Sequence, residues 1–212
     1  ETPAMRGPRR TVLSGTVPMS STDQLSREHR QHLLELAWPS IHQGLETGRP
    51  KQVDPVEWPE PLQVHRASFV TLYHRNGNLR GCIGAIEAYQ PLVRDVAEHA
   101  YAAAFRDPRF PPVTAGELDT IRLSISVLTI PEPMGVPSEG DLLDQLTPGE
   151  DGLILEDGPH RSTFLPAVWS SLETPAAFLR ELKRKAGLGP DYWSPTIRFR
   201  RYRTESFGED EV

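Results

Sequence analysis

Apolar residues recur at helical spacing in three stretches of the chain. The stretches run from Ser26 to Gly48, from Pro91 to Asp107 and from Thr174 to Gly187. Each begins at a capping residue or a proline and ends at glycine or at Asp-Pro, as amphipathic helices do. We therefore predict three helices that each turn one face to a core. Pro39 removes a hydrogen bond inside the first helix and predicts a kink or a break there.

Other segments alternate in polarity or are rich in β-branched and aromatic residues, which predicts strands. We expect strands over residues 67–74, 78–86, 120–129, 152–156, 160–165 and 196–202. Asn76-Gly77 and Asp157-Gly158 predict two hairpin turns. Thr114 and Glu117 have capping-box spacing, and residues 141–146 predict a further short helix. Hairpins with helices inserted between them predict an α+β fold that is mostly antiparallel.

The same pattern outlines the domain organisation. Residues 1–22 mix Pro, Gly, Ser, Thr and Arg without periodicity, which predicts a flexible leader. Residues 23–207 carry all the predicted helices and strands, so we expect them to form one domain. Residues 208–212 predict an acidic tail that frays.

Composition narrows the class of function. The formal net charge of −6 argues against a general nucleic-acid-binding surface, because phosphate contacts need an excess of Lys and Arg. A single cysteine cannot form an internal disulfide, which fits a reducing compartment, so we expect a cytoplasmic protein. No apolar run approaches the roughly 20 residues of a membrane helix, so we expect no membrane partner.

That cysteine, Cys82, lies on a predicted strand between Gly81 and Gly84. Residues i and i+2 of a strand share a face, so we expect Arg80 beside Cys82, where a cation would favour the thiolate. The two glycines suit a bulge or the close approach of a ligand or another backbone. Buried cysteines also act as small hydrophobes, and we weigh that alternative equally.

A two-residue turn at Asn76-Gly77 predicts which residues accompany Cys82. In that register Thr71 faces Cys82, Tyr73 faces Arg80, and His74 lies on the opposite face. A three-residue loop would shift the parity and bring His74 to the cysteine side.

Further candidate residues lie elsewhere in the chain. A nucleophilic cysteine needs a base, and the sequence does not choose among His65, His74, His99 and His160. Asp107 and Arg109 sit in a rigid, proline-rich segment, where they either line a cleft or bond backbone groups of a connector; we favour the connector.

No pattern in the sequence indicates a metal or a phosphate. The chain lacks His-Glu-x-x-His, paired cysteines and glycine-rich phosphate loops, so we predict no metal site and leave the cofactor unknown. Arg180, Lys183, Arg184 and Lys185 form a charged run on the third helix, which is typical of a solvated face.

Several motifs together resemble the AMMECR family, whose prokaryotic members are called protein A of the AmmeMemoRadiSam system. They are the signature Leu79-Arg80-Gly81-Cys82-Ile83-Gly84, the run from Ala103 to Val113, Ile125-Ser126-Val127-Leu128, Phe164-Leu165-Pro166 and Lys185-Ala186-Gly187-Leu188. The resemblance implies an α+β domain with a larger and a smaller lobe flanking a cleft, with the signature cysteine near it. It also implies association with a Memo-like protein and a radical SAM protein, but no assigned reaction.

Two hypotheses follow. In the first, the protein is a cysteine-dependent enzyme or small-molecule modifying factor. Cys82 is its nucleophile or ligand anchor, Arg80 binds an anion or lowers the pKa of the thiol, and Asp107 and Arg109 shape the cleft. A salt bridge from Arg80 to a nearby carboxylate is the equally weighted alternative for that residue. In the second, it is a non-catalytic adaptor in which Gly81 and Gly84 admit a partner to the hairpin.

Overall fold

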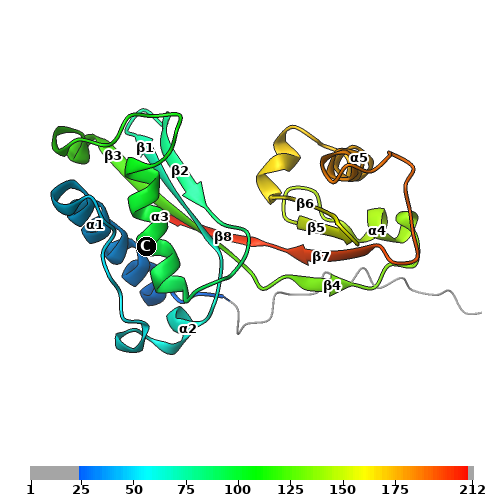
Figure 1. The fold of residues 1–212 in the computed structure, drawn as a ribbon, viewed down its shortest axis with the longest axis horizontal. Coiled ribbons are helices and arrows are strands. Elements are labelled where there is room, and N and C mark those ends of the chain that lie inside the picture. The colour runs from blue at the N-terminus through cyan, green and yellow to red at the C-terminus, as the bar shows by residue number, and fades with distance from the viewer. Residues whose placement is uncertain (1–23, 210–212) are drawn as a thin grey trace, which may run out of the picture.

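The structure, a computed structural model, describes residues 24–209. The predicted leader and the last three residues of the predicted tail lie outside this range. The fold is α+β and contains two antiparallel four-stranded sheets, which lie toward opposite ends of the long axis (Figure 1). The helices are α1 (Arg27–Thr47), α2 (Glu60–Gln63), α3 (Leu92–Phe105), α4 (Glu139–Gln145) and α5 (Pro175–Lys185). The strands are β1 (Ser68–His74), β2 (Leu79–Gly84), β3 (Ile121–Leu128), β4 (Glu132–Met134), β5 (Gly152–Asp157), β6 (His160–Phe164), β7 (Arg198–Tyr202) and β8 (Thr204–Gly208).

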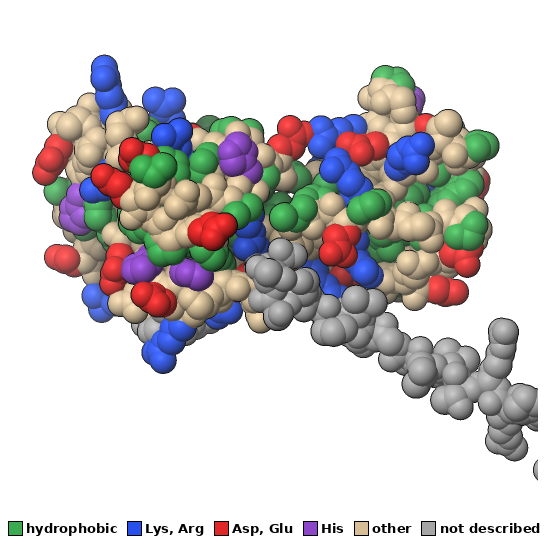
Figure 2. Space-filling model, turned by 90° about the horizontal axis from the view of Figure 1, so that it is seen from below, with side chains coloured by type: hydrophobic (Ala, Val, Ile, Leu, Met, Phe, Trp, Pro, Cys, Tyr) green, Lys and Arg blue, Asp and Glu red, His purple; other side chains and the backbone are tan. Residues whose placement is uncertain are grey.

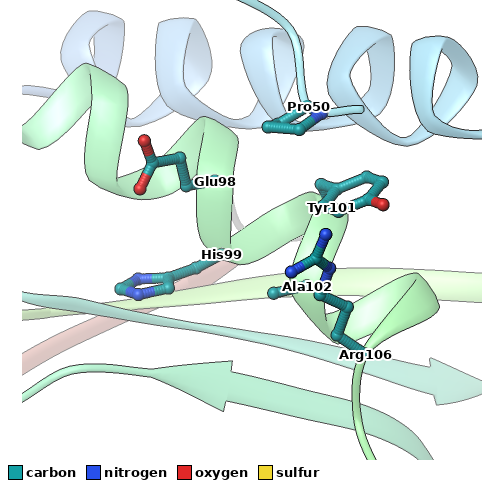
Figure 3. Close-up of a pocket in the computed structure, with 6 residues that line it drawn as sticks. All are labelled: Pro50, Glu98, His99, Tyr101, Ala102 and Arg106. Atoms are coloured by element: carbon teal, nitrogen blue, oxygen red, sulfur yellow. The ribbon is translucent and has the colours of Figure 1, made fainter. Parts of the chain in front are cut away.

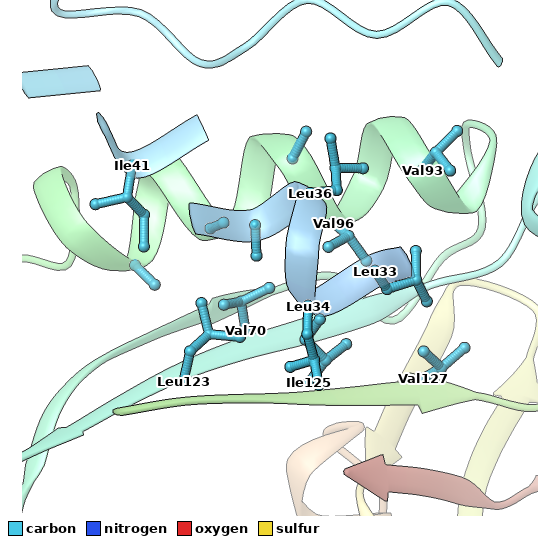
Figure 4. Packing of buried hydrophobic residues seen from close by; sticks show 14 of the residues in the cluster. Leu33, Leu34, Leu36, Ile41, Val70, Val93, Val96, Leu123, Ile125 and Val127 are labelled. Carbon is cyan, nitrogen blue, oxygen red and sulfur yellow. The ribbon is translucent and has the colours of Figure 1, made fainter. Parts of the chain in front are cut away.

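The first sheet has the order β2-β1-β3-β8, and α1 and α3 cover one of its faces. Alternate residues of β3 from Ile121 to Val127 are buried, so these apolar side chains turn toward the helices. Figure 4 shows this packing, with Leu33 and Leu36 of α1 and Val96 of α3 above Val70 and Ile125 of the sheet. All five side chains are almost fully buried. Burial of this apolar surface is the main force that holds the layer together.

The second sheet has the order β4-β7-β5-β6 and carries its own core. Phe178 of α5 stacks on Trp169 with ring centroids 4.0 Å apart, and both pack with Leu155 and Phe199 of the sheet. The predicted hairpin is confirmed, with Asp157 paired to His160.

The ends of α1 form as predicted. The Ser26 side chain accepts a hydrogen bond from the His29 N–H at 3.1 Å. Gly48 ends the helix with a φ of 69°, the left-handed conformation that glycine adopts without strain. The helix continues through Pro39, so that proline does not break it.

Two strands were missed by the sequence reading, and one of them enters the predicted tail. β4 is short and contains a proline, and β8 begins only one residue, Arg203, after the end of β7, where the prediction ended its last strand. β8 includes Gly208, and Glu209 accepts hydrogen bonds from Trp38 Nε1 at 2.7 Å and from the Leu123 N–H at 3.1 Å. These first two residues of the predicted tail are therefore bound to the first sheet.

The prediction of a solvated charged face on α5 is wrong for Lys183. Its side chain is fully buried, and its Nζ donates to Glu139 Oε2 at 2.6 Å and to the Pro190 carbonyl at 3.1 Å. Arg180 and Arg184 are exposed as predicted. Elsewhere the basic side chains are interspersed with acidic ones, as Figure 2 shows for one face of the molecule.

The two sheets meet in a small apolar cluster. It contains Ala67 and Leu128 from the first half and Ile154 and Tyr202 from the second. The chain crosses between the sheets twice, and the crossings are tied because the Thr129 N–H donates to the Arg203 carbonyl at 2.8 Å. No helix within residues 24–209 is both long enough and apolar enough to cross a membrane.

Candidate functional site

The hairpin of β1 and β2 holds Cys82, and its register differs from the prediction near the turn. The His74 N–H donates to the Asn78 carbonyl at 2.8 Å, so the loop has three residues, and Gly77 takes a φ of 85°. Tyr73 consequently pairs with Leu79. A β-bulge at Arg80 then restores the predicted register, and Thr71 pairs with Cys82.

The bulge overturns the expected pairing of Tyr73 with Arg80 and the shared face of Arg80 and Cys82. Arg80 is 4% exposed and turns away from the cysteine pocket. Its Nε donates to Glu117 Oε1 at 2.9 Å, and its Nη2 donates to the Pro111 carbonyl at 2.9 Å. Leu79 lines the pocket with Cys82 in its place. Arg80 is thus a structural residue that anchors the segment after α3.

Cys82 is partly exposed and lines a pocket of about 330 Å³. The Thr71 hydroxyl donates a hydrogen bond to Cys82 Sγ at 3.3 Å. Both predicted neighbours, Thr71 and Tyr73, line this pocket. The remaining lining residues are Phe69, Leu79, Arg109, Ser126, Leu165, Pro166, Ala167, Thr204 and Ser206.

Asp107 and Arg109 hold the backbone of Cys82 from its outer side. The Cys82 N–H donates to Asp107 Oδ2 at 2.8 Å, and Arg109 Nη2 donates to the Cys82 carbonyl at 3.3 Å. Arg109 also grips Asp107 through Nε at 2.9 Å and Nη2 at 2.7 Å. These bonds from Arg109, with those from backbone N–H groups, hold the pKa of Asp107 well below its usual range. The predicted connector is confirmed, and Arg109 lines the pocket as well.

The two glycines of the signature are required by the protein's own packing. A Cβ on Gly81 would lie 2.1 Å from the Ala103 carbonyl oxygen of α3. A Cβ on Gly84 would lie 2.4 Å from the ring of Phe69. The protein's own atoms fill both spaces, so the missing side chains of these glycines do not admit a partner to the hairpin as the adaptor hypothesis expects.

The four candidate histidines lie away from Cys82. His74 is on the opposite face of β1, His65 is exposed beside Pro91, and His160 contacts the Ala186 carbonyl at 2.8 Å. His99 lines a different pocket, shown in Figure 3, and its Nδ1 is 3.1 Å from Asp95. Among the described residues, no histidine lines the cysteine pocket.

The sequence reading missed the part of the pocket that comes from distant segments. Leu165, Pro166 and Ala167 follow β6, and Thr204 and Ser206 belong to β8. The one signal for them was the motif Phe164-Leu165-Pro166, which carries part of the resemblance. The pocket offers a thiol, a guanidinium, hydroxyls and apolar walls. Within residues 24–209 there is no group of three or more His, Cys, Asp or Glu placed to hold a metal ion.

Comparisons with known proteins agree with the motifs. The family model AMMECR1 matches residues 34–207. A protein of Methanothermobacter thermautotrophicus is 40% identical over 192 residues, which covers 88% of this chain and 97% of that protein. Protein MJ0810 of Methanocaldococcus jannaschii is 39% identical over 161 residues, covering 73% of this chain and 78% of that protein.

A solved structure shares the fold. The crystal structure of the uncharacterized protein PH0010 from Pyrococcus horikoshii matches with a TM-score of 0.71 and 35% identity, covering 88% of this chain and 94% of that one. The wider cleft between two lobes that the resemblance implies stays a prediction. The signature strand, the family model and this structural match together show that the chain belongs to the AMMECR1 family.

Proposed function

We propose that the protein is a cysteine-dependent enzyme or modifying factor for a small molecule, with Cys82 as its nucleophile or ligand anchor. The observation that supports this most is the position of the thiol, which lines a pocket built from both halves of the molecule. The pocket volume, about 330 Å³, is at the lower end of the range for small-ligand sites, about 300 to 1,000 Å³.

The surroundings of the thiol limit its chemistry. The Thr71 hydroxyl donates a hydrogen bond to Sγ, so the sulfur acts as an acceptor and one of its lone pairs points toward Thr71. No histidine from residues 24–209 lines the pocket, so the proposed nucleophile is not paired with a histidine base there. In the proposed role, the thiol proton passes to water or to the bound molecule.

Alkylation tests the proposal, because Cys82 is the only cysteine in the chain. We expect iodoacetamide to label the folded protein at a rate that stays constant in urea below the unfolding transition. A cysteine that serves only as packing would react through unfolding, and its rate would rise with urea. That second result would overturn the proposal. The Cys82→Ser protein, followed by intact mass, controls for labelling elsewhere.

Association with a Memo-like protein and a radical SAM protein remains a proposal that rests on the family resemblance. Co-purification of each candidate with the tagged protein, at several salt concentrations, would test it. At Cys82 the outer edge of β2 is occupied by Asp107 and Arg109, which disfavours an adaptor that binds this edge.

A further inference from the structure

Resting on the proposed function, we infer that the cysteine pocket binds a small organic anion with a single charged group, of the carboxylate class, and that Arg109 binds that group. The sequence left open whether Arg80 binds an anion or forms a salt bridge with a carboxylate. The structure places Arg80 behind the strand and puts Arg109 in the pocket wall with Cys82. Arg109 is therefore the cation that a ligand next to the thiol would meet.

The guanidinium of Arg109 is held in place and still has donors to offer. Nε and Nη2 bond the two Asp107 oxygens, and Nη2 also reaches the Cys82 carbonyl. Nη1 makes no hydrogen bond to any residue from 24 to 209, and the side chain is 55% exposed. A guanidinium fixed in this way loses little conformational entropy when it binds a carboxylate.

The negative charge of Asp107 does not cancel the attraction of Arg109 for an anion in the pocket. The Asp107 side chain is 2% exposed, and its oxygens already accept bonds from Arg109 and from the Cys82 N–H. The pair thus presents its positive end to the pocket. Arg109 is the only Lys or Arg among the described lining residues, and none of them is Asp or Glu. A single cation matches one charged group better than a polyphosphate.

The rest of the pocket fits an uncharged body of modest size. Phe69, Leu79, Leu165 and Pro166 supply apolar walls. The hydroxyls of Thr71, Ser126, Thr204 and Ser206 can donate or accept hydrogen bonds with polar substituents. The Ser126 and Ser206 hydroxyl oxygens are 2.7 Å apart and already bond each other.

Paired alkylating agents test the inference. Iodoacetate and iodoacetamide both form an S–C bond at Cys82 and release iodide, with the thiol proton passing to water, but only iodoacetate carries a carboxylate. We expect the ratio of the iodoacetate rate to the iodoacetamide rate to be about tenfold higher in the folded protein than in urea-unfolded protein. Arg109→Gln should remove that preference, and Arg109→Lys should keep part of it. Arg106→Gln, an exposed arginine outside this pocket, is the matched control.

The ratio separates the two proposals. If iodoacetamide reacts with the folded protein but the ratio is the same in Arg109→Gln and wild type, the anion inference fails and the proposed function stands. If neither reagent reacts before unfolding, the proposed function fails. Arg109 contacts the Cys82 carbonyl, so its substitution can disturb the strand. A second measurement therefore uses the wild-type protein and asks whether an added ligand protects Cys82 from alkylation. We expect benzoate to slow iodoacetamide labelling more than benzamide does; equal protection would overturn the inference.

Discussion

At the scale of single residues, two arginines take opposite parts in the site. Arg80 comes from the signature strand, yet the bulge turns its buried side chain away from Cys82 and into an ion pair with Glu117. Arg109 lies on a loop after α3 and reaches the Cys82 backbone from outside the sheet. A one-residue irregularity therefore decides which cation a ligand at Cys82 meets.

Glu117 makes the anchoring of Arg80 dependent on pH. The hydrogen bond from Arg80, with bonds from Thr114, lowers the pKa of Glu117 from 4.5 to about 2. A carboxylate whose pKa is lower in the folded state stabilises the fold above its unfolded pKa, and this contribution is lost as pH falls. We predict that wild type loses stability between about pH 4.5 and pH 2, and that Glu117→Gln loses less of it in that window.

Urea midpoints measured at a series of pH values would check this prediction. Glu46→Gln changes an exposed carboxylate of α1 and serves as the control, with a pH profile like that of wild type. Parallel profiles for Glu117→Gln and wild type would contradict the role of the Arg80 pair.

At the scale of elements, the site depends on how closely α3 approaches β2. Buried alanines on α3 and the missing side chain of Gly81 let the helix backbone contact the strand. The chain leaves α3 at Arg106, so close packing sets Asp107 and Arg109 against the backbone of Cys82. The signature glycine and the proline-rich loop are thus parts of one arrangement.

Substituting Gly81 by Ala should separate these two elements. The new Cβ would lie 2.1 Å from the Ala103 carbonyl oxygen, and backbone cannot move aside as a flexible side chain can. We predict a loss of about 1 to 3 kcal/mol in the free energy of unfolding, which is the usual cost of overpacking. Urea unfolding would measure it. Gly116→Ala, where nothing lies within 4 Å of the added Cβ, should change stability little; an equal loss in both variants would refute the argument.

At the scale of the whole molecule, the pocket exists because the two sheets are joined. Leu165 and Pro166 come from the second half of the chain, and Cys82 comes from the first. Tyr202 is central to the junction, since its ring packs with Leu128 and Ile154 and its hydroxyl donates to the Phe164 carbonyl at 3.0 Å. The positions of the pocket-lining residues from the two halves relative to each other therefore depend on the junction at Tyr202.

Removal of the Tyr202 side chain should uncouple the two halves. We predict that Tyr202→Ala costs about 3 to 5 kcal/mol, as large aromatic truncations do, and that the halves then unfold in separate transitions. Hydrogen exchange of the β1 and β3 amides compared with the β5 amides would show the separation. Tyr89→Ala alters a side chain that is 56% exposed and should behave as wild type. A single shared transition in Tyr202→Ala would count against this prediction.

The sequence predicted those features that neighbouring residues control. The Ser26 cap, the Gly48 stop and the alternation of β3 were all read correctly, because each depends on a few adjacent side chains. The pairing of Thr71 with Cys82 was also right, although a bulge compensates for the longer turn. The burial of Lys183 was not readable, because its partners Glu139 and Pro190 lie on other segments.

By itself, then, the sequence determined the α+β class, most elements and the strand that carries Cys82, since local propensity and periodicity are sufficient for these. Only the tertiary structure decided that Arg109 rather than Arg80 lines the pocket, that the candidate histidines lie elsewhere, and that Leu165 and Thr204 help to enclose the thiol. The physical reason is that these features arise from a backbone bulge and from contacts between segments distant in sequence. Side-chain periodicity records which face a residue occupies, but not which remote segment packs against it.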